Sequence, residues 1–163
     1  MSEAAQALRW AGSVIPDSVN REKDDFYSTP PEGTLALLKR ETFVGSIWEP
    51  ACGDGAISKV LIDAGYDVFS TDLVDRGYGN SGVDFLMEYG GTTDNIVTNP
   101  PFKLAEEFLL HALPRARNKV ALLCRLAWLE GEGRRKIFES TPLARVWVFS
   151  RRLNINRSGL APA

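Results

Sequence analysis

The feature that most restricts the fold is an alternation of short apolar runs, typical of buried strands, with segments whose apolar residues recur at helical spacing. The clearest unit joins a strand at 46–49 to a helix at 56–64 through a turn that contains two glycines. Further strands are predicted at 67–71, 83–85, 95–98, 119–124 and 144–149, and further helices at 103–113 and 132–139. Strands that alternate with helices indicate an α/β fold, in which helices cover both faces of a parallel sheet.

The N-terminal part is predicted to be an arm followed by a helix. Residues 1–23 hold a short apolar patch broken by glycine and proline, so we expect a loosely packed arm there and one domain over residues 24–163. At residues 29–32 a threonine and a glutamate stand at capping-box spacing around two prolines, which favour the first positions of a helix. The sequence therefore predicts that a helix begins here.

Length and composition leave room for one soluble domain. The chain has 163 residues, of which 44% are hydrophobic and 25% are charged, as expected of a packed globular core. No apolar run approaches the roughly 20 residues that a membrane helix needs, and the first residues lack the features of a signal peptide. Two cysteines, Cys52 and Cys124, and one histidine, His111, give neither a disulfide framework nor a metal-ligand pattern. We therefore expect a cytoplasmic protein that binds no metal and no membrane.

Charge is divided unevenly along the chain, although the net charge is only −2. Residues 1–100 contain 7 Lys and Arg against 16 Asp and Glu, whereas residues 101–163 contain 12 against 5. An acidic half suits a cationic small molecule and a basic half suits a polyanion, although solvated surface charge accounts for the same numbers. Net charge alone therefore does not decide whether nucleic acid is a partner.

The turn after the first predicted strand combines glycines with carboxylates. Its sequence, residues 49–55, is Glu-Pro-Ala-Cys-Gly-Asp-Gly, and the glycines allow a sharp bend close to a ligand. The turn lacks the third glycine of the dinucleotide fingerprint, and Glu49 and Asp54 would repel a pyrophosphate. A ligand that carries an ammonium and a sulfonium, such as S-adenosylmethionine, suits this lining better. Asp72 follows Gly53 by 19 residues, near the offset at which an acid binds ribose hydroxyls; an ordinary strand-end carboxylate is the alternative.

A second constellation, Asn99-Pro100-Pro101-Phe102, follows a predicted strand. Two consecutive prolines cannot continue a strand ladder or a helix interior, so the tetrapeptide is predicted to be a rigid loop. The amide oxygen of Asn99 and the carbonyl of Pro100 can accept the hydrogens of a conjugated amino group and so localise its lone pair for attack on a methyl group. Phe102 would stack on the ring that carries this amino group. A tight turn with a core phenylalanine is the alternative.

Together these motifs resemble the class I S-adenosylmethionine-dependent methyltransferases, specifically the DNA adenine-N6 branch, including versions encoded in phage genomes. The resemblance covers residues 24–150. Residues 24–30 are similar to the family's upstream cofactor motif, residues 49–55 to its glycine loop, and residues 99–102 to its catalytic tetrapeptide. The resemblance implies S-adenosyl-L-methionine as the cofactor. It also implies a three-layer, Rossmann-like, mostly parallel sheet, which here is expected to lack the final antiparallel strand.

The resemblance also implies roles for individual residues. The implied catalytic residues are Asn99, Pro100, Pro101 and Phe102. The implied cofactor-binding residues are Tyr27, Thr29, Pro30, Glu49, Pro50, Ala51, Gly53, Asp54, Gly55, Asp72 as the ribose-binding acid, Asp84 and Phe85 beside the cofactor adenine, and Asn99.

Three functions stay open at this point. The leading one is methyl transfer to the N6 amino group of adenine in DNA, which requires base flipping if the substrate is a duplex. The second is methylation of an amino or amide nitrogen in RNA or protein, and the third is a cofactor-binding interaction module without turnover. Cysteine-based methylation of cytosine is rejected, because both cysteines are expected to be core residues.

The segment after residue 150 is short for a family member that reads its own target. We therefore expect that the chain is truncated here, that a homodimer or a partner subunit completes target recognition, or that target selection is rudimentary or borrowed. Candidate phosphate contacts for a DNA partner are Arg115, Arg117, Lys119, Arg134, Arg135, Lys136, Arg151, Arg152 and Arg157.

Overall fold

The computed structural model describes residues 26–155. The predicted arm at 1–23 lies outside these residues, as do residues 24, 25 and 156–163. Within the described range, no helix has the length and apolarity that crossing a membrane requires. The elements in chain order, with η for a 3-10 helix, are α2 (Pro31–Leu38), β1 (Ile47–Glu49), α3 (Ala56–Asp63), β2 (Val68–Ser70), η3 (Phe85–Met87), β3 (Thr93–Thr98), η4 (Phe102–Leu104), α4 (Ala105–Ala112), β4 (Ala116–Leu122), η5 (Leu126–Leu129) and α5 (Glu132–Ser140).

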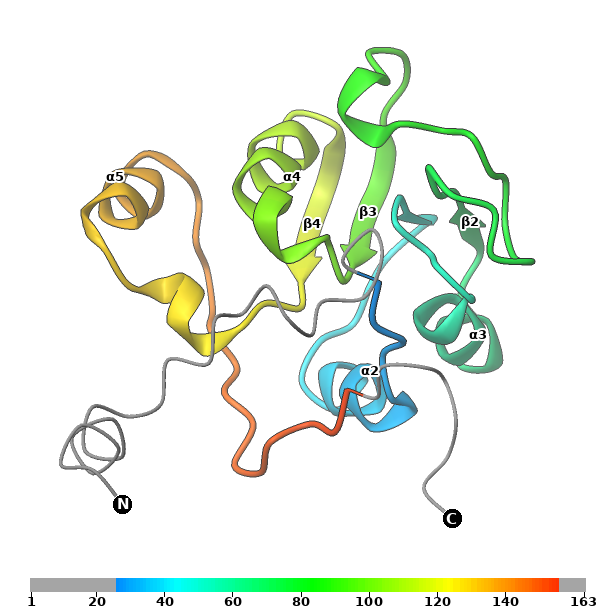
Figure 1. The fold of residues 1–163 in the computed structure, drawn as a ribbon, viewed down its shortest axis with the longest axis horizontal. Coiled ribbons are helices and arrows are strands. Elements are labelled where there is room, and N and C mark those ends of the chain that lie inside the picture. The colour runs from blue at the N-terminus through cyan, green and yellow to red at the C-terminus, as the bar shows by residue number, and fades with distance from the viewer. Residues whose placement is uncertain (1–25, 156–163) are drawn as a thin grey trace, which may run out of the picture.

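Four parallel strands form the sheet in the order β2-β1-β3-β4 (Figure 1). β1 pairs with β2 on one side, where Ile47 faces Val68, and with β3 on the other, where Ile47 faces Asn95. The strand order therefore reverses beside β1, and the loops after β1 and β3 leave the sheet at neighbouring carboxyl ends. In open α/β sheets this is where ligands bind. The predicted α/β fold with a parallel sheet is confirmed.

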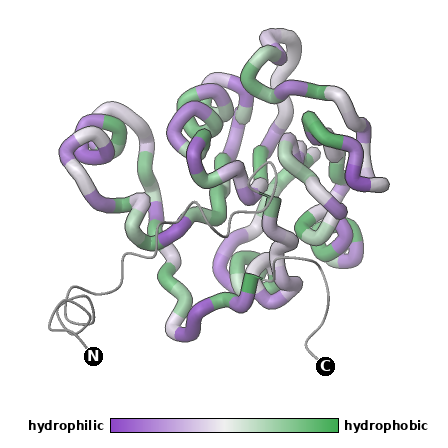
Figure 2. Tube along the Cα trace, viewed as in Figure 1, coloured by the Kyte–Doolittle hydropathy of each residue, from purple (hydrophilic) through white to green (hydrophobic). Residues whose placement is uncertain are grey.

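Consecutive strand residues point to opposite faces of the sheet and build two cores. Ile47 and Val97 belong to one core, together with side chains from α2, α3 and the segment between α2 and β1. Their chain neighbours Trp48 and Ile96 belong to the other core, with side chains from η3 and α4. Helices α2 and α3 thus cover one face and α4 covers the other, which gives the predicted three layers (Figure 1). Figure 2 shows hydrophilic and hydrophobic residues alternating along these helices, as expected for helices with one buried side.

The predicted strand at 83–85 is wrong. Asp84 accepts a hydrogen bond from the Leu86 amide at 3.0 Å and caps the 3-10 helix η3. A short polar side chain that bonds its own downstream backbone competes with a strand ladder for that amide. A single parallel bridge forms earlier in this loop, between Thr71 and Asn80.

The predicted strand at 144–149 is also wrong, because these residues have no regular secondary structure. Arg145 and Trp147 donate hydrogen bonds to the carboxylate of Glu41, at 3.0 Å from the indole nitrogen. Aromatic and β-branched residues favour a strand only where a neighbouring strand accepts their backbone hydrogen bonds. Side chains anchor this segment instead. Within residues 26–155 no strand follows β4, which covers 116–122 rather than the predicted 119–124.

The first described helix begins where expected, but without the predicted capping box. Pro30 is the N-cap of α2, and no side chain of the described residues caps the helix. The hydroxyl of Thr29 accepts a hydrogen bond from Asn99 Nδ2 at 3.1 Å. Thr29, at 5% exposure, therefore contacts the loop after β3 rather than the helix that follows it.

Candidate functional site

The loops after β1, β2 and β3 line a cavity of about 320 Å³ at the carboxyl ends of the strands. Gly53 and Asn99, from the two sequence motifs, share this cavity. Of the predicted site residues, Pro30 and Gly55 do not line it. Those that do are Tyr27, Thr29, Glu49, Pro50, Ala51, Gly53, Asp54, Asp72, Asp84, Phe85, Asn99, Pro100, Pro101 and Phe102.

Carboxylates dominate the polar part of this lining, and we call it the acidic cavity. Glu49, Asp54, Asp72 and Asp84 all line it, and among residues 26–155 Arg76 is the one cation that does so. The guanidinium carbon of Arg76 lies 4.1 Å from the centroid of the Phe26 ring. The cavity therefore favours a ligand with positive charge and disfavours a phosphate.

The two glycines after β1 have left-handed backbone conformations, with φ of 55° at Gly53 and 79° at Gly55. A Cβ at Gly53 would come within 2.4 Å of the Phe26 ring, and one at Gly55 within 2.5 Å of the Tyr78 ring. The sequence predicted that these glycines allow a ligand to approach. In the structure, aromatic side chains occupy the space beside both of them.

The carboxylate of Asp72 holds the glycine turn in place. It accepts hydrogen bonds from the backbone amides of Gly53, at 2.8 Å, and Val74, at 2.9 Å. Because each carboxylate oxygen can accept two hydrogen bonds, one acceptor position on each oxygen is left for a ligand. Asp72 is therefore more than a strand-end carboxylate: it connects the turn after β1 to the loop after β2.

Glu49 is a buried acid at the end of β1, at 1% exposure. Burial raises its pKa from 4.5 to about 8, the hydrogen bond donated by the Ser58 hydroxyl lowers it, and the nearby charges of Asp54 and Asp72 raise it further. Ser58 in turn lies 2.6 Å from the hydroxyl of Ser70. At neutral pH the free protein thus holds Glu49 mainly as the neutral acid, and the negative charge of the cavity comes from its aspartates.

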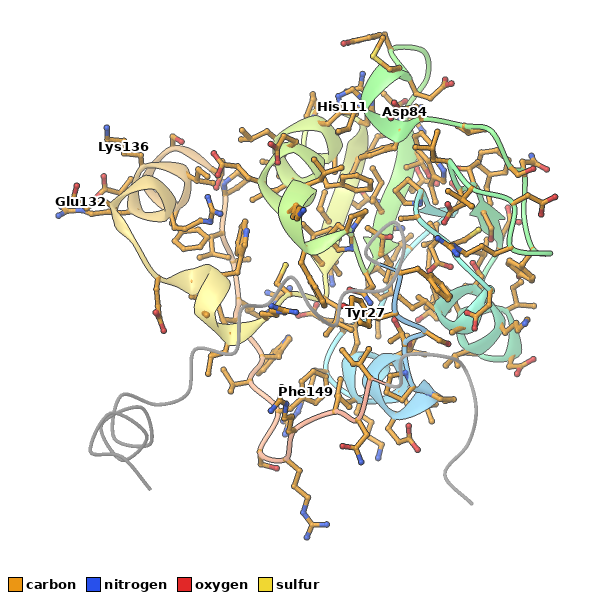
Figure 3. The ribbon with its side chains drawn as sticks, in the orientation of Figure 1. Tyr27, Asp84, His111, Glu132, Lys136 and Phe149 are labelled. Atoms are coloured by element: carbon orange, nitrogen blue, oxygen red, sulfur yellow. The ribbon has the colours of Figure 1, made fainter. Side chains whose placement is uncertain are left out.

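A short segment, residues 26–30, joins the glycine turn to the tetrapeptide. The hydroxyl of Ser28 donates to Asp54 Oδ2 at 2.7 Å, and Tyr27 stacks on Phe102 with ring centroids 5.4 Å apart. Thr29 accepts the hydrogen bond from Asn99 described above. Figure 3 shows Tyr27 between α2 and the carboxyl ends of β3 and β4. Consecutive residues of this segment therefore contact both motifs.

Asn99 is the most informative polar group of the cavity. Its Nδ2 donates to Thr29 Oγ1, which fixes the orientation of the amide. Its Oδ1 is buried and accepts no hydrogen bond from the part of the chain that the structure describes. A buried acceptor of this kind costs free energy unless a ligand or water satisfies it. The tetrapeptide thus presents one fixed acceptor to whatever enters the cavity.

Asp84 and Phe85, the predicted adenine-contacting pair, line the cavity and also stabilise the fold. Asp84 caps η3, and Phe85, at 2% exposure, packs against the rings of Trp48, Phe108 and His111. His111 Nε2 is 2.9 Å from the Glu88 carbonyl oxygen and its ring contacts Tyr89, and His111 does not line the cavity.

Neither cysteine is set up as a nucleophile. Burial raises the pKa of Cys52 to about 12 and that of Cys124 to about 11, so both remain thiols at neutral pH. Among the described residues, no group of His, Cys, Asp and Glu side chains is arranged to hold a metal ion.

A second cavity, of about 380 Å³, is also lined by Phe102. We call it the basic cavity, because Lys103, Arg125 and Arg134 line it and no carboxylate among residues 26–155 does so. The guanidinium carbon of Arg125 lies 4.3 Å from the Phe102 centroid, and that of Arg134 lies 5.0 Å from the Trp128 ring. Phe102 is the wall that the two cavities share.

Several residues of these cavities were missed in the sequence. Ser58 lies among the buried residues of α3, and a polar residue on an apolar helix face indicates a buried partner. Phe26 and Ser28 lie inside the motif at 24–30, but nothing in its spacing identifies their contacts. Arg125 is missing from the candidate phosphate contacts and Trp128 from the candidate site residues, because neither belongs to a recognisable motif.

Comparison with known proteins finds similarity in fold only. No protein-family model matches the chain, and no curated protein does. Among solved structures, the chain is similar to the magnesium protoporphyrin IX methyltransferase ChlM of Synechocystis PCC 6803 with bound SAM, at 18% identity and a TM-score of 0.41. The aligned part covers 56% of this chain and 53% of ChlM, so the chain spans about half the length of that protein.

Two further solved structures show a similar relation. TrmN from Thermus thermophilus has 20% identity and a TM-score of 0.43, over 60% of this chain and 37% of TrmN. A TehB-like SAM-dependent methyltransferase from Corynebacterium glutamicum ATCC 13032 has 21% identity and a TM-score of 0.41, over 73% of this chain and 67% of its own. These similarities concern the fold of part of each chain.

Proposed function

We propose that this chain transfers a methyl group from S-adenosyl-L-methionine to the exocyclic N6 amino group of adenine in DNA. The observation that carries the proposal is the buried Oδ1 of Asn99, a fixed acceptor on the same cavity as a group of carboxylates. The resemblance of residues 99–102 to the catalytic tetrapeptide of adenine-N6 methyltransferases supports the choice of acceptor.

The acidic cavity suits the proposed cofactor in size and charge. About 320 Å³ falls within the range of roughly 300–1,000 Å³ that is usual for small-molecule sites. Asp54 and Asp72 would offset the ammonium and sulfonium charges, and the remaining acceptor positions of Asp72 suit ribose hydroxyls. When bound, S-adenosyl-L-methionine supplies an electrophilic methyl group, whose S–C bond breaks as the new N–C bond forms.

The tetrapeptide would prepare the amino group of the acceptor. The lone pair of an exocyclic amine is delocalised into its ring, which makes the nitrogen a poor nucleophile. Asn99 Oδ1 and the carbonyl of Pro100 would accept its two hydrogens, holding the nitrogen in place and drawing its lone pair out of conjugation. Thr29 keeps the Asn99 amide oriented, and Phe102, on which Tyr27 already stacks, would border the ring that carries the amino group. The methylated nitrogen would then release a proton to water, so this chemistry requires no strong base.

A methyl-transfer assay tests the proposal. Purified protein is incubated with S-adenosylmethionine carrying a radioactive methyl group and with adenine-containing DNA, RNA of the same sequence, or a protein mixture. We expect incorporation into DNA, recovered as N6-methyladenine after nucleoside digestion, and none into a DNA strand without adenine. Incorporation only into RNA or protein would favour the second function considered above. Cofactor binding without incorporation would favour the interaction module, and absence of both would overturn the proposal.

A further inference from the structure

The basic cavity is not used by the proposed cofactor chemistry, yet it touches the same tetrapeptide. Lys103 directly follows Phe102 in the chain, and Arg125 lies over the Phe102 ring. Arg134 reaches the cavity from α5 and forms an ion pair with Glu106 of α4. Three cationic side chains, from η4, from the residue before η5 and from α5, thus converge on one cavity.

Of the charged side chains on α5, only some face the basic cavity. Figure 3 shows Glu132 and Lys136 pointing away from the sheet, on the outer side of α5. Arg135, the neighbour of Arg134, is 78% exposed, pairs with Glu139 one turn later and does not line the cavity. Only part of the positive charge of this helix therefore faces the tetrapeptide.

We propose that the basic cavity binds the phosphate backbone of a single nucleic-acid strand beside the nucleotide that enters at the tetrapeptide. This inference rests on the proposed function and adds the place on the chain at which the backbone of the acceptor strand is held. Guanidinium groups bind phosphate oxygens in bidentate fashion, and a lysine adds a point charge. The fixed position of Arg134, between Glu106 and the Trp128 ring, suits a site that is formed before the ligand arrives.

Aromatic side chains in the same cavity favour a nucleic acid over an acidic peptide. Phe102 and Trp128 both line the basic cavity. Arg125 lies over the Phe102 ring and Arg134 over the Trp128 ring, and bases of single strands stack on guanidinium planes as well as on aromatic rings. An acidic peptide would use the charges of these cations but has no base to stack on the guanidinium–ring pairs. The occupant that uses both kinds of side chain is a strand of nucleotides.

Fluorescence anisotropy with a labelled single-stranded DNA of about 12 nucleotides tests the inference. The variants Lys103→Gln, Arg125→Gln and Arg134→Gln remove one cation of the cavity each. We expect each to weaken binding by about tenfold and to reduce the dependence of binding on salt. The matched control is Arg135→Gln, which removes an equally charged, ion-paired side chain from the same helix and should change the affinity by less than about twofold. A polyglutamate peptide of similar length should not displace the DNA.

Each alternative outcome counts against the proposal. It is overturned if the unsubstituted chain does not bind the strand, if Arg135→Gln weakens binding as much as Arg134→Gln, or if polyglutamate displaces the DNA. Should loss of the Glu106 ion pair unfold Arg134→Gln, the Lys103 and Arg125 variants carry the test, with circular dichroism confirming their fold. Calorimetric titration with S-adenosylmethionine shows that the variants still bind the cofactor, and the methyl-transfer assay then separates the two proposals.

If the cavity variants transfer methyl groups as fast as the unsubstituted chain, this inference alone is overturned. If DNA binding depends on the cavity but no methyl group is transferred, the proposed function alone is overturned.

Discussion

The two cavities share the ring of Phe102 but differ in charge and in how they are built. The acidic cavity takes all its carboxylates from residues 49–84, within the acidic half of the chain. The basic cavity takes its cations from residues 103–134, within the basic half. The overall charge of −2 conceals this division. A net charge near zero can therefore arise from two sites with opposite preferences that meet at one side chain.

The cavities also differ in what fixes their walls. Backbone amides at the carboxyl ends of strands hold the aspartates of the acidic cavity, as the contacts of Asp72 with Gly53 and Val74 show. Side chains hold the walls of the basic cavity, through the Glu106 ion pair and the contact of Trp128 with Phe138 at 5.7 Å. Substitutions at the acidic cavity should therefore have larger and more specific effects than substitutions at the basic one.

The largest effect is expected at Asn99. Replacing it in Asn99→Ala removes the acceptor that would hold the amino group, so transfer should fall by about 10³-fold or more. Cofactor affinity should stay nearly intact, because Asp54 and Asp72 remain. Steady-state kinetics and calorimetry measure the two quantities. Asn118→Ala, which removes only a surface hydrogen bond to Val44, serves as the control. A folded Asn99→Ala protein that has lost cofactor affinity would contradict this role.

Asp72 should give the next largest effect, on cofactor binding rather than on DNA binding. Asp72→Ala removes the two backbone contacts that hold the glycine turn and the proposed ribose contact, which predicts about a hundredfold loss of cofactor affinity. Asp75→Ala is a matched control in the same loop, because Asp75 accepts a backbone hydrogen bond from Gly77 but does not line the cavity. Equal losses in both variants, measured by calorimetry, would mean that Asp72 acts only on the loop.

The pH dependence of stability tests whether Glu49 is neutral, so that the aspartates supply the negative charge of the acidic cavity. Because its pKa rises from 4.5 to about 8 on folding, its contribution to stability is fully present below 4.5 and is lost as the pH rises through about 8. Between about pH 6 and about pH 7.5 the protein should therefore lose about 2 kcal/mol of unfolding free energy that Glu49→Gln does not lose, or about thirtyfold in the equilibrium. Urea titrations at several pH values measure this difference.

Glu41 provides a control of opposite sign. Hydrogen bonds from Arg145 and Lys119 lower its pKa to about 2, so its contribution is present above 4.5 and is lost as the pH falls through about 2. Glu41→Gln should therefore destabilise the protein at neutral pH, where Glu49→Gln stabilises it. If both substitutions shift stability in the same direction at neutral pH, Glu49 is not held as the neutral acid.

The sequence predicted the acidic cavity far better than the basic one. The acidic residues sit in motifs whose turns follow strands, and the carboxyl ends of neighbouring parallel strands meet at one edge. Chain spacing alone thus brings Glu49, Asp72 and Asn99 together. The basic cavity depends on where η5 and α5 pack, and no short-range pattern encodes how Arg125 comes to lie over Phe102.

The errors in the fold have a common cause. Residues 83–85 and 144–149 have the composition of strands, but in both places side-chain hydrogen bonds determine the outcome. Asp84 bonds to the Leu86 amide, and Glu41 bonds to Arg145 and Trp147, more than a hundred residues away. A propensity says what a segment can form when a partner strand is available, and the availability of that partner is a tertiary property.

The smallest expected effect is a difference in salt dependence between ligand binding at the two cavities. If the three cations of the basic cavity contact phosphates, raising salt from about 50 mM to about 200 mM should weaken single-strand binding by about twentyfold, since each contact contributes a slope of about 0.7. Cofactor affinity should change by less than about twofold, because its charges lie within a Debye length of the aspartates that offset them. Anisotropy and calorimetry on the same samples measure both slopes. Equal slopes would mean that both ligands respond to the average charge of the protein, and the division between the cavities would then have no role in binding.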